Sequence, residues 1–241
     1  TFNKYIERER LHIVGRNHRN PTLKTYKTFI VIPCFAEFNY IFKTLDSINE
    51  QNLELLKSCL VIIVINNSTS DSLDIKQNNK KTYEKLKLKK YNFEFVIIDC
   101  YSKKYALDSN ISGVGIARKI GLDYCLMFAN NKKNLLCSLD ADTQIHKHYL
   151  DHIISLFNQS EIDACVINFK HQASNDQIIE KGIRKYEFII KNIAKKIDDA
   201  GSPYGYVSLG STIICTVKAY IASGGMSKKK ATEDFYFLQA F

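Results

Sequence analysis

The sequence lacks the features that mark membrane-spanning and disulfide-bonded proteins. No apolar run approaches the roughly 18 residues that are needed to cross a bilayer, and no secretory signal peptide is visible. The seven cysteines include no C-x-x-C pair and lie mostly in or beside apolar runs. We therefore expect neither a zinc site nor a disulfide framework, but buried, reduced thiols in a cytoplasmic protein, with membrane association left open.

The sequence also has few features that would mark a boundary between domains. It contains three prolines and shows no internal repeat and no linker-like segment. Its 241 residues fit one large domain or two small ones. We expect an N-terminal arm or partial helix over 1–27 and one domain over 28–241. Because the chain stops inside an apolar, helix-like segment, we expect that domain to continue beyond it.

Positive charge is in excess. The chain has 34 Lys and Arg residues against 25 Asp and Glu residues, a net charge of +9. This excess favours anionic partners, such as nucleotides, phosphorylated lipids or the anionic face of a membrane, without choosing among them. Because many of the lysines lie in Asn-rich, surface-like segments, a solvated basic surface is the simpler explanation.

Short apolar runs alternate with segments of helical periodicity. Strands are predicted at 29–32, 60–65, 93–99, 135–139, 164–167 and 206–216. Helices are predicted at 37–49, 76–92, 113–129, 150–157 and 179–197. We expect the helix at 76–92 to be exposed, that at 113–129 to be amphipathic, and that at 179–197 to carry a wide apolar stripe. This alternation implies an α/β fold with a mostly parallel sheet and helices on both faces.

The strand at 135–139 ends on two acidic residues, Asp140 and Asp142. Ligands of open α/β sheets collect at the carboxyl ends of strands, and Mg²⁺ commonly takes one or two carboxylates together with substrate phosphates. The alternative is that Asp142 caps the next helix. Polar clusters also follow the strands at 29–32 and 60–65, and right-handed crossovers predict that all three clusters meet at one edge of the sheet.

Together these segments resemble the motifs of family-two glycosyltransferases. V-I-P-C-F-A-E at 31–37 resembles the family's P-x-Y-N-E turn, I-V-I-N-N-S-T-S-D at 63–71 its V-V-D-N-G-S-T-D turn, and G-I-A-R-K-I-G at 115–121 its A-R-N-x-G helix. L-D-A-D-T at 139–143 matches the D-x-D motif, and Gly224-Gly225 followed by Thr232-Glu233-Asp234 matches the G-G … E-D ending. Each motif alone is weak, but five in the right order are specific.

The resemblance implies a GT-A fold with a nucleotide-binding N-terminal half and an acceptor-side C-terminal half. It implies inverting transfer of a sugar from a nucleotide-sugar, by default a UDP-sugar, to an acceptor hydroxyl on a glycan, a lipid-linked molecule or a protein. Nucleic acid is not an expected partner, and peripheral contact with an anionic membrane face stays open. The donor would be bound by Pro33, Phe35, Glu37, Asn66, Arg118 and Asp140.

The resemblance also implies a divalent metal, Mg²⁺ or Mn²⁺, bound by Asp142 with Asp140. Such a metal acts as a Lewis acid on the leaving diphosphate. Asp234, with Glu233 beside it, would take the proton from the acceptor hydroxyl, and a well-placed base contributes about 10²–10⁴-fold. Asn66 stands where the family has Asp, so a neutral amide oxygen would accept from the base and the donor's identity stays open. Further departures are Phe35 for Tyr, Ala36 for Asn, Ser68 for Gly and Lys119 for Asn.

Several other patterns are weaker. Gly113 to Arg118 partly matches G-x-G-x-x-G, but Arg118 stands where the third glycine should be and no strand directly precedes, which argues against a dehydrogenase. Arg118 is then either a helix-start cation near the donor or an exposed arginine. His148 and His152 share a helix face without the H-E-x-x-H pattern and are expected to be exposed. The residues after Asp142 do not fit a calcium loop.

Two rival functions remain. One is a noncatalytic module that binds a nucleotide-sugar or a partner. The other is a sugar-phosphate nucleotidyltransferase, which would carry a Gly-rich loop with Arg and Lys after the first strand, unlike Pro33 to Glu37. The lysines at 228–230 are either a solvated charge run or a loop that closes on the donor diphosphate.

Overall fold

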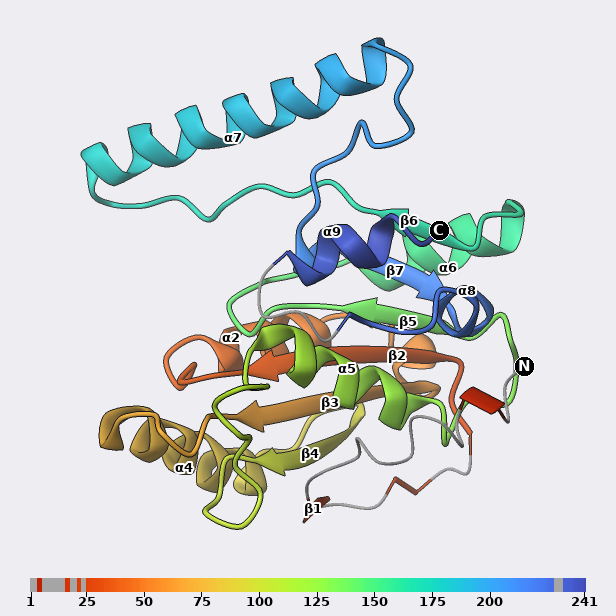
Figure 1. The fold of residues 1–241 in the computed structure, drawn as a ribbon. Helices are drawn as coiled ribbons and strands as arrows, with labels where there is room; N and C mark the ends of the chain where they lie inside the picture. The colour runs from red at the N-terminus through yellow and green to blue at the C-terminus, as the bar shows by residue number, and fades with distance from the viewer. Residues whose placement is uncertain (1–3, 6–15, 18–20, 23–24, 228–231) are drawn as a thin grey trace.

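A seven-stranded sheet forms the centre of the protein, in a computed structural model that describes residues 4–5, 16–17, 21–22, 25–227 and 232–241 (Figure 1). The strand order is β1-β4-β3-β2-β5-β7-β6. The four central strands are parallel: β4 (Glu94–Cys100), β3 (Cys59–Asn66), β2 (Thr28–Cys34) and β5 (Leu135–Ser138). The three outer strands pair antiparallel with their neighbours: β1 (Arg16–Asn17) at one edge, and β7 (Ile213–Thr216) and then β6 (Ala164–Val166) at the other. The predicted α/β class with a mostly parallel central sheet is confirmed.

Helices cover both faces of this sheet. One face carries α2 (Ile41–Asn49), α3 (Leu53–Leu56), α4 (Leu73–Leu88) and α6 (Tyr149–Gln159). The other carries α5 (Val114–Cys125), α8 (Val217–Ala222) and α9 (Glu233–Leu238), and a 3₁₀ turn, η2 (Gly210–Thr212), precedes β7. Strand side chains alternate between the two cores: Phe29 and Val31 point to the α5 side, Ile30 and Ile32 to the α2 side. Double coverage explains why β3 is buried along its whole length.

Pro33 is the last residue but one of β2, whereas the predicted strand stops at residue 32. The backbone of β2 pairs with β5 from Thr28 to Val31, and the last bond on that side runs from the Leu139 N–H to the Val31 carbonyl. Residues two apart in a strand direct their backbone groups to the same neighbour. The missing N–H of Pro33 therefore faces the side on which β5 has already ended, and no ladder bond is lost.

Two predicted elements differ in burial or extent, and a third lies apart from the sheet. Helix α5 is buried from Gly115 to Cys125, on all its sides, because it is enclosed by the sheet, α8 and α9. The strand predicted at 206–216 is a strand only over Ile213–Thr216, since η2 occupies its middle. Helix α7 (Gln177–Asp199) forms as predicted but lies apart from the sheet layers (Figure 1).

Other expectations concern the surface and the termini. All seven cysteines are free thiols; six are buried and Cys165 is half-buried. His148 and His152 are exposed, as expected. Across the described segments, no helix combines the length and apolarity that a membrane span requires. Most of the predicted arm at 1–27 and the lysines at 228–230 lie outside the described residues.

Candidate functional site

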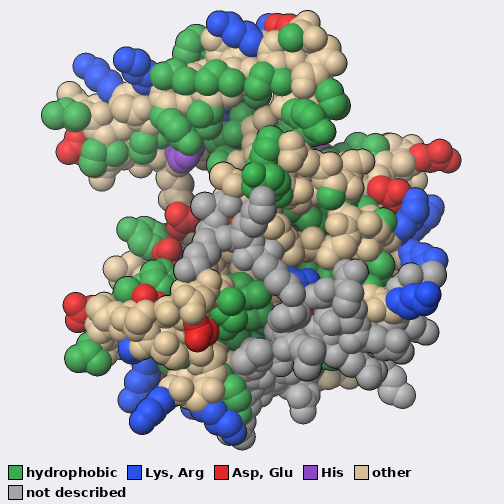
Figure 2. Space-filling view, viewed as in Figure 1, with side chains coloured by type: hydrophobic (Ala, Val, Ile, Leu, Met, Phe, Trp, Pro, Cys, Tyr) green, Lys and Arg blue, Asp and Glu red, His purple; other side chains and the backbone are tan. Residues whose placement is uncertain are grey.

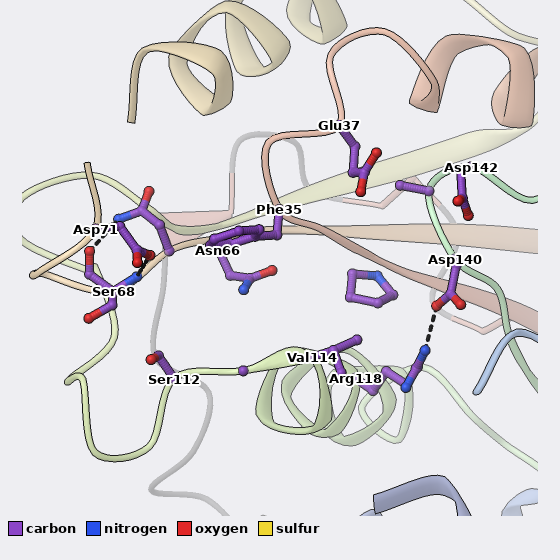
Figure 3. A pocket seen from close by; sticks show the side chains of 14 residues that line it. Phe35, Glu37, Asn66, Ser68, Asp71, Ser112, Val114, Arg118, Asp140 and Asp142 are labelled. Atoms are coloured by element: carbon purple, nitrogen blue, oxygen red, sulfur yellow. Dashed lines mark hydrogen bonds and ion pairs between the residues drawn. The ribbon is translucent and has the colours of Figure 1, made fainter. Parts of the chain in front are cut away.

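A cavity of about 540 Å³ opens at the carboxyl ends of β2, β3 and β5 (Figure 3). Its size lies within the range that is usual for small-molecule sites, roughly 300–1,000 Å³. The start of α5 forms the opposite wall. The lining includes every residue predicted to bind the donor or the metal: Pro33, Phe35, Glu37, Asn66, Arg118, Asp140 and Asp142. The predicted convergence of three polar strand ends on one edge is therefore observed.

One end of the cavity is built around Asn66. Its side chain is 2% exposed, and its Oδ1 atom is buried with no hydrogen-bond partner among the described residues. Leaving a buried acceptor unpaired costs about 1–3 kcal/mol, so a ligand N–H is the expected partner. The exposed ring of Phe35 lies beside Asn66, and Val114 projects from the facing wall (Figure 3). This end can hold a flat, hydrogen-bonding ring.

A buried asparagine on α4 fixes this end of the cavity. The Nδ2 group of Asn79 donates to the Asn66 carbonyl at 3.0 Å and to Oδ1 of Asn67 at 2.9 Å. Its Oδ1 accepts from the backbone N–H of Ala36 at 2.9 Å. Asn79 thus joins the turns that follow β2 and β3. No sequence pattern indicated this role, because α4 was predicted only as an exposed, Lys- and Asn-rich helix.

The other end of the cavity is acidic. Burial and then the charge of Asp140 raise the pKa of Asp142, although its own backbone and His171 act in the opposite direction. Burial, then Asp142 and Asp140, raise the pKa of Glu37. Mutual repulsion of this kind is relieved by a cation, and carboxylate oxygens are the donors that Mg²⁺ and Mn²⁺ prefer.

These residues fit a divalent metal that is shared with a substrate. Among the described residues no three His, Cys, Asp or Glu side chains are grouped closely enough to hold a metal by themselves. Mg²⁺ in phosphate-transfer sites usually has one or two protein carboxylates and completes its shell with water and phosphate oxygens. Asp142, with Asp140, can supply that smaller set.

Arg118 connects the acidic end to the C-terminal helix. It is 4% exposed, so it is not the exposed arginine that the sequence left open. Its Nη1 lies 2.6 Å from Oε1 of Glu233, and its Nη2 pairs with Oδ1 of Asp140 (Figure 3). The guanidinium also fills the space beside Gly210, where an added Cβ would lie 2.1 Å from the Arg118 Cζ. One buried cation thereby joins α5, the loop after β5, and α9.

The two predicted catalytic acids sit differently from the donor residues, since neither lines the cavity. Glu233 is buried, and burial is the main cause that raises its pKa, with Arg118 acting against it. Asp234 is half-buried at the start of α9, and its Oδ1 accepts from the Phe235 N–H at 2.7 Å. The segment just before α9, at 228–231, is not described. The catalytic role of Asp234 therefore stays a prediction.

Lys119, a departure from the family pattern, has a structural explanation. Its ammonium is 1% exposed and lies 3.0 Å from Oδ2 of Asp123. It also donates to the Tyr5 hydroxyl at 3.1 Å, and the hydroxyls of Tyr5 and Tyr220 donate to Oδ1 of Asp123. This buried cluster ties Tyr5 and α8 to α5. Lys119 is not among the residues that line the cavity.

Several lining residues were not among the predicted site residues. They flank the predicted positions: Asn67, Ser68, Asp71, Ser112, Gly113, Val114 and Ala141. Asp71 closes the turn after β3, because its Oδ2 accepts from the Ser68 N–H at 2.6 Å. Adjacency to a strand end was the available signal for most of them, whereas the segment at 112–114 adjoins no strand end.

A comparison with sequence profiles of protein families finds one match. The sequence profile described as "Glycosyl transferase family 2" matches residues 29–209, which is more than half of the chain. Among curated proteins, none matches the chain significantly.

Solved structures show the same fold at low sequence identity. S. aureus TarS 1–349 in complex with UDP-GlcNAc has a TM-score of 0.54 at 17% identity, over 89% of this chain and 53% of that chain. Mannosyltransferase PcManGT from Pyrobaculum calidifontis, in complex with GDP-Man and Mn²⁺, has a TM-score of 0.52 at 12% identity, over 99% and 59%. Glucosyl-3-phosphoglycerate synthase from Mycobacterium tuberculosis, in complex with Mn²⁺, UDP and phosphoglyceric acid, has a TM-score of 0.50 at 13% identity, over 93% of this chain and 70% of that chain. The chain thus spans little more than half of TarS 1–349 and of the mannosyltransferase.

Proposed function

The chain belongs to glycosyl transferase family 2, and on this premise we propose that it transfers a sugar from a nucleotide-sugar, by default a UDP-sugar, to an acceptor hydroxyl with inversion and with a divalent metal. The observation that carries the proposal is a cavity that joins a buried, unpaired Asn66 oxygen at one end to a carboxylate pair at the other. A nucleoside diphosphate has a base and an anionic end to match. The free, buried thiols suit a reducing, cytoplasmic compartment.

The nucleobase would occupy the Asn66 end. Oδ1 of Asn66 would accept from a ring N–H, and the adjoining face of Phe35 would support the base by stacking. A side-chain amide has one acceptor and one donor group, so it suits an edge that offers both, as uracil does. TarS with UDP-GlcNAc and the synthase with UDP support this choice of donor.

The diphosphate and the metal would occupy the acidic end. Asp142, with Asp140, would hold Mg²⁺ or Mn²⁺, which when bound stabilises the charge that grows on the leaving diphosphate. Glu37 would add to the negative potential that attracts the cation. The Mn²⁺ in the mannosyltransferase and synthase complexes supports a divalent metal.

Proton transfer would fall to Asp234. In an inverting displacement the acceptor oxygen forms a bond to the anomeric carbon as the bond to the diphosphate breaks, and the acceptor proton must leave in the same step. Asp234 would accept that proton, while Glu233, held by Arg118, would fix the start of α9. Acceptor residues are not assigned.

The test is release of nucleoside diphosphate from UDP-sugars by the wild-type chain and by Asp234→Asn, with Mn²⁺ present. We expect turnover by the wild type, loss of about 10²-fold or more in Asp234→Asn, and unchanged donor binding in that variant. Asp74→Asn, an exposed acid in the first turn of α4, is the matched control and should keep full activity.

Two results would contradict the proposal. Donor binding by the wild type without any turnover would favour the noncatalytic module. Full activity in Asp234→Asn would refute the assignment of Asp234 as the general base, but not the proposed transferase activity.

A further inference from the structure

Helix α7 exposes an apolar stripe. Its members follow at helical spacing along one side of the helix: Ile179, Tyr186, Ile189, Ile193 and Ile197. All five are exposed, and in Figure 2 hydrophobic side chains run along this helix above the body of the protein. A contiguous apolar face of this kind marks a contact surface.

The two borders of the stripe differ. Along one border the helix is covered by the segment 167–176, which we call the strap: Arg184 Nη2 donates to the His171 carbonyl at 2.7 Å and Lys191 Nζ to the Phe169 carbonyl at 2.6 Å. Along the other border lie the exposed side chains of Lys181, Lys185 and Lys196. The stripe is thus flanked by ammonium groups that are free to approach an anionic surface.

We propose that α7 docks the protein on the surface of an anionic lipid bilayer, with the stripe buried among acyl chains and Lys181, Lys185 and Lys196 at the head groups. A long helix with an apolar stripe that lysines border, too polar as a whole to cross a bilayer, has the chemistry of an interfacial helix. The net charge of +9 favours the same surface over long range.

A second copy of the chain fits this surface less well. An antiparallel two-fold contact would set the lysine border of one helix against its own copy, and like charges oppose such a contact. A parallel contact would set the lysine border against the strap, which already covers that side. An anionic bilayer satisfies the lysines along their whole length.

The docking surface connects directly with the candidate site. Gln172 of the strap donates from Nε2 to the Asp142 carbonyl at 2.8 Å, and Arg184 of α7 donates to the Gln172 carbonyl at 3.3 Å. Two hydrogen bonds therefore link the helix to the backbone of the acidic loop. The helix that docks is thereby held to the loop that carries Asp142.

The absence of tryptophan provides the test. Tyr186→Trp places a single fluorophore on the stripe, and Leu88→Trp places one at a more exposed position at the end of α4, far from α7 (Figure 1). Each is titrated with vesicles of phosphatidylcholine alone and with 30% phosphatidylserine, with and without brominated acyl chains. We expect a blue shift and quenching for Tyr186→Trp on anionic vesicles, and neither for Leu88→Trp.

Two further variants, made in the Tyr186→Trp background, separate the contributions. Replacing Lys181, Lys185 and Lys196 with Gln should weaken binding about a hundredfold, since each lysine near an anionic surface contributes a factor of about five. Ile189→Ser should weaken it about tenfold. Circular dichroism and melting temperature verify that each variant folds.

Absence of binding to anionic vesicles, or equal binding to neutral ones, would overturn the proposal. So would a dimer in sedimentation that Ile189→Ser dissociates while vesicle binding is absent, because the stripe would then belong to a second copy. Stabilisation by a nucleoside diphosphate is measured in the same variants. It is measured in the wild-type chain as well, and its absence there would count against the proposed function and not against docking.

Discussion

Replacing Arg118 with methionine removes the buried cation that joins the acidic loop to α9. The Arg118–Glu233 pair spans 2.6 Å with both side chains at most 5% exposed. Removing one partner of a buried ion pair costs about 3–5 kcal/mol, because the other charge is left without compensation. At about 2–4 °C for each kcal/mol in a chain of this size, the melting temperature should fall by about 6–20 °C.

The loss should depend on pH in a defined direction. Arg118 lowers the pKa of Glu233, so its removal raises that pKa further above the unfolded value. A carboxyl group with a raised folded-state pKa favours the folded state below its unfolded pKa, and that contribution is lost as pH rises through the folded pKa. The destabilisation of Arg118→Met should therefore be larger at pH 8 than at pH 4.

The assay is urea unfolding at both pH values, with Lys218→Met as the control. The Lys218–Asp163 pair is equally short at 2.6 Å but exposed, so its loss should cost less than about 1 kcal/mol. Gly210→Ala should destabilise in the same direction as Arg118→Met, because its Cβ displaces the guanidinium. An Arg118→Met variant no less stable than Lys218→Met would refute the account of a connecting cation.

Four further outcomes are expected. Asp142→Asn should raise the free energy of unfolding at pH 7, because burial and Asp140 raise the pKa of Asp142. This added stability should vanish below the unfolded pKa of 3.8, and urea unfolding that shows lower stability of the variant at pH 7 would contradict the prediction. Asn79→Ala should lower the free energy of unfolding by about 1–3 kcal/mol in the same assay, since three backbone and side-chain groups lose their partner. Unchanged stability would show that Asn79 does not hold the turns after β2 and β3 together. Ala36→Asn should stabilise by about 1 kcal/mol, because Ala36 has φ 57° and asparagine tolerates that conformation; a lower melting temperature would count against it. Iodoacetamide at pH 8 should modify the native thiols slowly and Cys165 first, since burial raises the pKa of Cys165 only to about 11 and this cysteine alone is half-buried. Mass spectrometry that finds rapid labelling of another cysteine would contradict the burial of the other six thiols.

The sheet and one half of the site could be predicted because they depend on local sequence. Apolar runs of strand length determined β2, β3, β4 and β5, and the polar residues after them had to meet at one edge once the strands were parallel. Asn66 and Asp142 therefore came together in one cavity as expected.

The remainder depends on contacts between distant segments, which no local pattern encodes. Arg118 is buried because partners 22 and 115 residues away neutralise it. Asn79 contributes nothing to an apolar stripe, so its place beneath two turns was invisible in a polar helix. The stripe on α7 predicted a helix with a contact face, but not that the face would lie away from the sheet.

Binding of UDP measured by titration calorimetry, with and without Mn²⁺, tests the central claim most directly. The account predicts that Mn²⁺ strengthens UDP binding to the wild-type chain, and that Asp142→Asn abolishes this dependence while Asp74→Asn preserves it. Binding that is indifferent to Mn²⁺, or equally Mn²⁺-dependent in Asp142→Asn, would contradict a metal held between Asp142 and the diphosphate.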